Sequence, residues 1–123
     1  MELTRDQKII RDVLIEVAQS YNYQISYTDL LIKSHLTHKY DMSYPPDRES
    51  FGGELGAISE YEVENGRPML SSVVYNLTAE KPGTGFFELA QALYKIDLTD
   101  KSARETFFYK ELDKTSQYWK KLK

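Results

Sequence analysis

The sequence contains no cysteine, which excludes disulfide bonds, thiolate metal sites, iron–sulfur clusters and a cysteine nucleophile. It also lacks an apolar run long enough to cross a membrane, and its first residues do not show the charged-then-apolar order of a signal peptide. Basic residues are not in excess, since the chain has 16 Lys and Arg and 19 Asp and Glu. The net charge of -3 argues against a strongly basic nucleic-acid coat protein and against an anionic-membrane binder. We therefore expect a cytoplasmic protein with no membrane partner.

The composition that remains is typical of one small globular domain. The 123 residues are 41% hydrophobic and 28% charged, and they show no repeat, low-complexity tract or linker. We therefore expect residues 1–123 to form a single domain. Ten tyrosines dominate the aromatic residues, and tyrosine suits half-buried positions and interfaces. They indicate either a core finished at its edges with tyrosine or a contact surface for a partner.

Helical periodicity is clearest near the start of the chain. Thr4 and Gln7 have the spacing of a capping box, and apolar residues then recur every three or four positions, which predicts a helix over residues 4–20. Ser26 and Asp29 repeat this spacing after a short extended piece. They predict a second, shorter helix.

A third helix is predicted between two prolines and a glycine stop. Asp47 is expected to cap it and Gly66 to end it. Three glycines lie inside the segment: Gly52, Gly53 and Gly56. Each costs about 1 kcal/mol against alanine in a helix interior, so either the helix begins near Glu54 or the glycines allow a neighbouring backbone to approach closely.

The period changes in the second half of the chain. Residues 69–76 are rich in β-branched and aromatic side chains, which predicts a strand. The glycine-containing turn at residues 80–85 then leads into a return strand or a helix. A final helix is expected to be capped by Thr99 or Asp100. Its consecutive aromatic residues 107–109 cannot all face the core, and a homodimer contact would explain the one left outside.

This order of elements indicates an α+β single domain with a winged-helix-like three-helix core, a β-hairpin over residues 69–87 and a C-terminal helix. Residues 25 to about 87 resemble the DNA-binding lobe of the alkylguanine DNA alkyltransferases. The reactive Pro-Cys-His-Arg run of that family is absent, which excludes its activity. The GRPMLSS run at residues 66–72 and the PGTGFF run at residues 82–87 also resemble a stretch of uncharacterised small bacterial and phage proteins, a resemblance that implies no known activity.

Charge distinguishes between protein and DNA as the partner. Residues 41–67 contain seven acidic residues and only two basic ones, Arg48 and Arg67. The helix in the place of a DNA-reading helix is therefore acidic. Such a helix would repel phosphates, and a protein partner is favoured. The alternative is a weak or regulated DNA-binding protein that uses Arg67, Lys81 and the C-terminal lysines.

Arg67 has two interpretations. It can form a salt bridge to one of the preceding glutamates, Glu60, Glu62 or Glu64. It can instead clamp an anion, because the guanidinium fork suits a carboxylate or phosphate. In that case Ser71, Ser72, Lys81 and the glycine turn would complete an anion site, which would fit a small enzyme.

The other candidate groups are weaker. His35 and His38 lack a clear third metal ligand, and Glu60 and Glu64, one helical turn apart, resemble a solvated pair. No catalytic constellation, metal site or cofactor motif stands out. The sequence therefore predicts a non-enzymatic binding or regulatory module. Its expected contact residues are Tyr44, Arg48, Glu60, Glu64, Arg67 and Lys81.

Overall fold

The computed structural model describes residues 2–76 and 84–123, and within them the chain is mostly helical. The α-helices are α1 (Arg5–Ala18), α2 (Tyr27–Lys33), α3 (Pro45–Glu64), α4 (Thr84–Tyr94) and α5 (Lys101–Lys120). Two short strands, β1 (Ile25–Ser26) and β2 (Val74–Tyr75), and one 3-10 helix, η1 (Leu70–Val73), complete the regular structure of this part of the chain. The fold is thus a small mixed α and β arrangement in which helices dominate.

Three helix starts agree with the capping patterns in the sequence. Thr4 and Gln7 form the reciprocal capping box of α1. Ser26 accepts a hydrogen bond from the backbone N–H of Asp29 at 3.1 Å and so caps α2. Asp100, one of the two residues expected to cap the last helix, accepts the N–H of Ala103 at 3.0 Å. These caps satisfy backbone donors that the first helical turn leaves free.

The third helix is longer than predicted. It begins at Pro45, with Tyr44 rather than Asp47 at the N-cap, and it is not delayed to Glu54. Proline suits the first helical position because its missing N–H would have no partner there. The three glycines therefore lie inside a 20-residue helix. Gly66 has a positive φ of 75° just beyond its end, as expected of a glycine stop.

The strand predicted over residues 69–76 is mostly wrong. Only the last part pairs as a strand, and the preceding residues form η1. The partner of β2 is β1, in parallel register, with Ile25 opposite Val74 and Ser26 opposite Tyr75. The expected hairpin pairing is therefore replaced by a long-range pairing within the described residues.

The glycine-containing turn at residues 80–85 lies largely outside the described residues. From residue 84 the chain is helical, so residues 85–87 form the start of α4 and not a return strand. No β-hairpin is present in the two described stretches. The wing expected in this region falls on residues 77–83, which lie outside the described residues.

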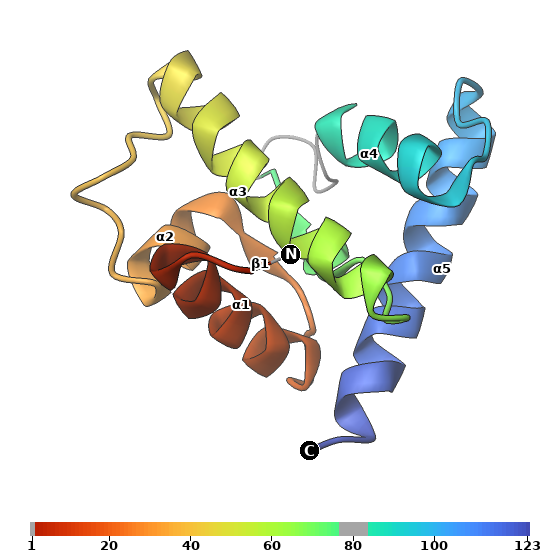
Figure 1. Cartoon of the computed structure of the whole chain (residues 1–123), viewed down its shortest axis with the longest axis horizontal. Coiled ribbons are helices and arrows are strands. Elements are labelled where there is room, and N and C mark those ends of the chain that lie inside the picture. The colour runs from red at the N-terminus through yellow and green to blue at the C-terminus, as the bar shows by residue number, and fades with distance from the viewer. Residues whose placement is uncertain (1, 77–83) are drawn as a thin grey trace.

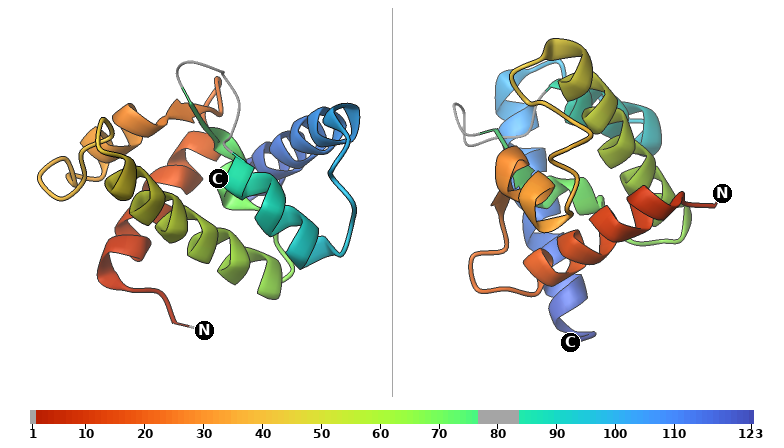
Figure 2. Two further views of the ribbon diagram at one scale, coloured as in Figure 1. Left: turned by 90° about the horizontal axis from the view of Figure 1, so that it is seen from above. Right: turned by 90° about the vertical axis from the view of Figure 1, so that its left-hand side faces the viewer.

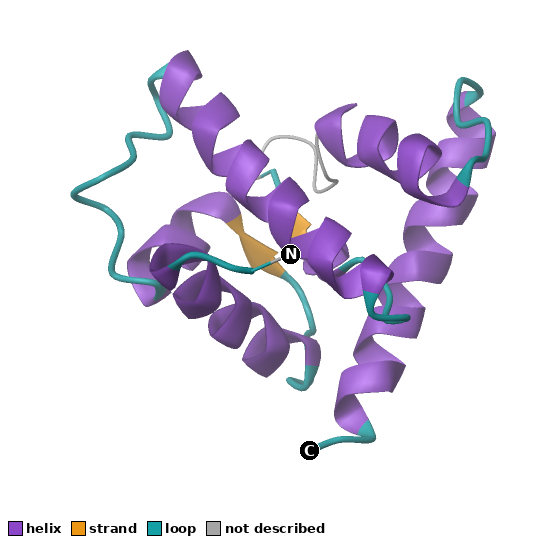
Figure 3. Ribbon diagram, viewed as in Figure 1, coloured by secondary structure: helices purple, strands orange, loops and turns teal. Residues whose placement is uncertain are grey.

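The helices are arranged on two sides of α3 (Figure 1). In this view α1 and α2 lie on one side, and α4 and α5 lie on the other. Seen from above, α1 crosses α3, and α4 and α5 stay on one side of it (Figure 2). The short strands lie behind α3 (Figure 3), and η1 contacts α1, α3 and α5. The fully buried apolar side chains come from all of these parts and include Ile10, Leu14, Leu30, Phe51, Ile58, Met69, Leu70, Val73 and Phe108. The chain between α3 and β2 thus runs through the centre of the fold.

Candidate functional site

Polar side chains from α3 and α5 hold this central segment in place. The N–H of Met69 donates to Oε2 of Glu111 at 2.8 Å, and the N–H of Ser71 donates to Oγ of Ser59 at 3.0 Å. The hydroxyl of Thr115 lies 3.2 Å from the carbonyl oxygen of Met69. All of these groups are buried, and a buried polar group without a hydrogen-bond partner would destabilise the folded state. The backbone here is bonded by side chains of distant helices instead of by a neighbouring strand, which is why no longer strand forms.

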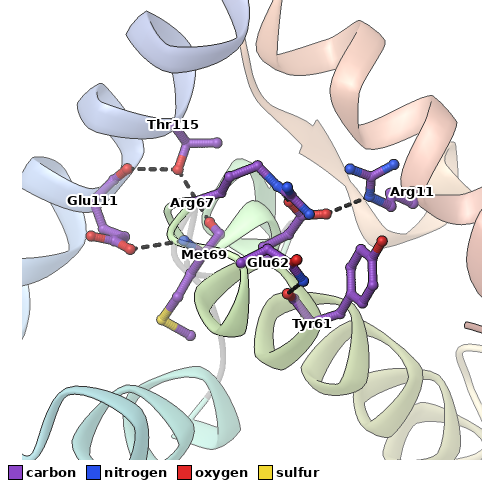
Figure 4. Close-up of polar contacts among 8 residues, drawn as sticks. Arg11, Tyr61, Glu62, Arg67, Met69, Glu111 and Thr115 are labelled. Carbon is purple, nitrogen blue, oxygen red and sulfur yellow. Dashed lines mark hydrogen bonds and ion pairs between the residues drawn. The ribbon is translucent and has the colours of Figure 1, made fainter. Parts of the chain in front are cut away.

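The carboxylate of Glu62 is fully buried between two arginines (Figure 4). Nε of Arg11, on α1, and Nε of Arg67 each donate to a different oxygen of this carboxylate. Both guanidinium groups lie 5.5 Å from the ring centre of Tyr61. The predicted salt bridge from Arg67 to one of three glutamates is therefore confirmed, and Glu62 is the partner.

Burial and the ion pair act in opposite directions on Arg67. Desolvation lowers the pKa of its guanidinium, but the hydrogen bond to Glu62 and the negative charge of that carboxylate raise it above the ordinary value. Arg67 therefore stays charged.

A second buried carboxylate, Glu111, is 2% exposed. Besides Met69 it accepts the hydroxyl of Tyr94, and Nζ of Lys114 lies 3.3 Å from its Oε1. Burial and the hydrogen bond to Glu111 raise the pKa of Tyr94, so its phenol is neutral near neutral pH.

Next to these two carboxylates lies a hollow of about 440 Å³, which we call the basic hollow. Its lining residues are Val63, Gly66, Arg67, Pro68, Tyr94, Lys114, Gln117, Tyr118 and Lys121. Three of them are cationic, and two present aromatic rings. This combination can attract an anion and cover an organic group attached to it.

A larger groove of about 730 Å³ lies between α3 and α4, and we call it the glycine groove. Gly52, Gly53 and Gly56 of α3 line it, together with Phe86 and Leu89 of α4. Its other lining residues are Tyr27, Pro45, Arg48, Glu49, Leu55, Ser71, Asn76, Gly85 and Glu88. The groove is thus bordered by apolar and neutral groups with few charges.

The structure distributes the predicted contact residues over different surfaces. Arg48 lines the glycine groove, and Tyr44, 55% exposed, precedes Pro45 at one end of it. Arg67 lines the basic hollow, whereas Glu60 and Glu64 line neither cavity. Lys81 lies outside the described residues.

The anion site predicted from Arg67, Ser71 and Ser72 does not converge. The hydroxyls of Ser71 and Ser59 lie 2.6 Å apart, and the hydroxyl of Ser72 lies 3.0 Å from that of Thr115. Both serines are buried and bonded within the fold, while Arg67 borders the basic hollow. The serines therefore hold the central segment.

The remaining candidates are dispersed. His35 and His38 are exposed, and no group of three potential metal ligands is found among the described residues. In the same part of the chain no helix is long and apolar enough to cross a membrane. Of the consecutive aromatics, Phe108 is 1% exposed and Tyr109 58%, as expected from their spacing; the homodimer contact stays a prediction.

Sequence reasoning missed the basic hollow because its walls come from distant segments. Lys114 and Lys121 are two of many exposed lysines in the sequence. Glu111 did leave a signal, because it shares the three- and four-residue spacing of Phe108, Leu112 and Thr115 on the buried stripe of α5. An acidic residue in an apolar stripe indicates a buried, paired carboxylate.

Comparison of the chain with protein-family models, with curated proteins and with solved structures finds no match.

Proposed function

We propose that the protein is a non-enzymatic binding module that takes up a segment of a partner protein in the glycine groove. In this proposal α1, α2 and α3 form a winged-helix-like core that carries the binding site. The position of β1 between the first two helices supports this scaffold.

The observation that carries the proposal is the unexplained space over the glycines of α3. A Cβ atom built at Gly52 or Gly53 meets no described atom within 4 Å, and one built at Gly56 meets only Cδ2 of Leu89, at an ordinary 3.6 Å. None of the three has a positive φ. Neither backbone conformation nor contacts among the described residues therefore require glycine here.

Glycine at these positions nevertheless lowers the stability of the helix. Each costs about 1 kcal/mol relative to alanine in a helix interior. Glycine allows another backbone to approach a helix closely. We infer that the groove over Gly52 and Gly53 accommodates the backbone of a bound segment.

The chemistry of the groove favours a polypeptide as the occupant. Pro45, Phe86 and Leu89 offer apolar surface. Among the described residues that line the groove, the charged ones are Arg48, Glu49 and Glu88. A nucleic acid needs an excess of cations to bind its phosphates. A peptide that carries apolar side chains and an occasional charge fits this lining better.

The experiment is a selection of random peptides displayed on phage against the immobilised protein, followed by binding tests on two variants. Gly52→Leu places a side chain in the open space of the groove. Ser50→Leu adds a leucine to an exposed position of the same helix that does not line the groove. We expect enriched peptides to bind the wild type and Ser50→Leu and to lose binding to Gly52→Leu. Equal binding to all three proteins, or no enrichment, would contradict the proposal.

A further inference from the structure

We propose that the basic hollow is a second, separate binding site and that its ligand is a phosphate monoester. Arg67, Lys114 and Lys121 contribute three positive charges to its lining. No aspartate or glutamate is found among the described residues that line it, although the whole chain has a net charge of -3. The hollow is therefore a local concentration of positive charge on an acidic protein.

The two buried carboxylates position the cations without cancelling them. Glu62 binds Nε of Arg67, and a guanidinium has five N–H donors, so donors remain for a ligand. Lys114, whose side chain is 62% exposed, lies 3.3 Å from Glu111. Lys121 is exposed beyond the last turn of α5. With Arg11 on the far side of Glu62, the cations outnumber the two carboxylates by four to two.

The number of cations favours a doubly charged ligand. A phosphate monoester carries roughly -1.5 to -2 charges at pH 7 and offers three acceptor oxygens. The guanidinium fork matches two of these oxygens, and a lysine can bind the third. A carboxylate carries one negative charge and offers two acceptor oxygens, so it matches the three lining cations less well.

The size and walls of the hollow favour an organic ester over a bare anion. The volume of about 440 Å³ falls within the range of small-molecule sites, roughly 300–1,000 Å³. The rings of Tyr94 and Tyr118 and the side chains of Val63 and Pro68 provide surface for a carbon skeleton. Tyr94 is neutral near neutral pH, so its phenol does not repel the phosphate.

The test is isothermal titration of the full-length protein with phenyl phosphate as the probe. Arg67 is left intact because its removal would take away one of the two arginines that neutralise the buried carboxylate of Glu62. Lys114→Gln/Lys121→Gln removes two charges from the hollow instead. Lys33→Gln/Lys101→Gln removes two charges from exposed positions that do not line it. We expect the first pair to lose about tenfold or more in affinity and the second to stay close to the wild type.

Other probes separate the proposal from non-specific attraction. Phenyl phosphate should bind more tightly than inorganic phosphate or sulfate, because the ring adds contacts with the tyrosines. A peptide that contains phosphotyrosine is then compared with phenyl phosphate. Tighter binding of the peptide would mean that a protein carries the ester, and tighter binding of phenyl phosphate would favour a small molecule. Both results support the site. The proposal would be overturned by undetectable binding, by equal losses in both double variants, by equal affinity for sulfate, or by duplex DNA binding more tightly than the ester. None of these measurements depends on the glycine groove, so the two proposals can fail independently.

Discussion

Arg67 pairs with the buried carboxylate of Glu62, five positions earlier in the chain, across the turn that ends α3. The same carboxylate binds Arg11 of α1. This contact explains why an arginine that the sequence offers as an anion clamp is first a structural residue. It also fixes the direction in which the chain enters the central segment, and it sets Arg67 at the edge of the basic hollow.

Replacing Glu62 tests the structural role of this pair. Glu62→Gln removes the charge and leaves Arg11 and Arg67 half-buried without a counter-ion. Breaking a buried ion pair in this way costs about 3 kcal/mol. We expect this loss in the free energy of unfolding, measured by urea denaturation. Glu64→Gln, two positions along at an exposed site, is the control and should change stability little. Equal effects of the two changes would contradict the pairing described here.

The glycines of α3 give a prediction of opposite sign. Gly52→Ala and Gly53→Ala should each stabilise the protein by about 1 kcal/mol, because alanine favours the helix and its Cβ meets no described atom within 4 Å. Gly66→Ala should destabilise it, because φ is 75° there. Denaturant unfolding of the three variants checks both signs. A loss of stability in the first two would mean that the space is needed within the folded chain itself.

The hydrogen bond from Tyr94 to Glu111 predicts a dependence on alkaline pH. The pKa of Tyr94 is raised from 10.0 by burial and by Glu111, so the folded state holds the phenolic proton more tightly than the unfolded state does. Its contribution to stability is complete below pH 10 and is lost as the pH rises from there towards the raised pKa. The stability difference between wild type and Tyr94→Phe should therefore shrink above pH 10. Unfolding experiments on both proteins measure it, and a constant difference would refute the coupling.

The acidity of α3 predicts that the protein does not bind duplex DNA. We expect no binding of mixed-sequence duplex DNA in a fluorescence-anisotropy titration at about 50 or about 200 mM salt, since phosphate contacts need clustered cations. Binding that weakens steeply with salt would favour the DNA-binding alternative. In that case Lys121 and its neighbours, together with Lys81, would be the residues to replace.

The local features of the fold could be predicted from the sequence. A cap depends on residues three positions apart, so Thr4, Ser26 and Asp100 indicated where helices begin. The central segment could not be predicted in this way, because two of the side chains that bind its backbone, Glu111 and Thr115, lie more than 40 positions further on. A segment rich in β-branched residues becomes a strand only when a neighbouring strand offers a partner, and here side chains occupy that place.

The same distinction applies to the candidate sites. Arg67 and the glycines of α3 stand out in the sequence because their residue types are unusual in their positions. The basic hollow combines segments around residues 67, 94, 114 and 121, and this proximity arises only through the packing of α3, α4 and α5. Lys114 carries no local pattern that would separate it from other surface lysines.

The most direct test of the central claim is to map where a selected peptide binds. Amide chemical shifts of the isotope-labelled protein would be followed during titration with a peptide enriched by phage display. Our account predicts that the largest changes fall on Gly52, Gly53, Gly56 and Gly85, which line the glycine groove. Changes confined to the basic hollow or to another surface would contradict the assignment of the groove as the protein-binding site.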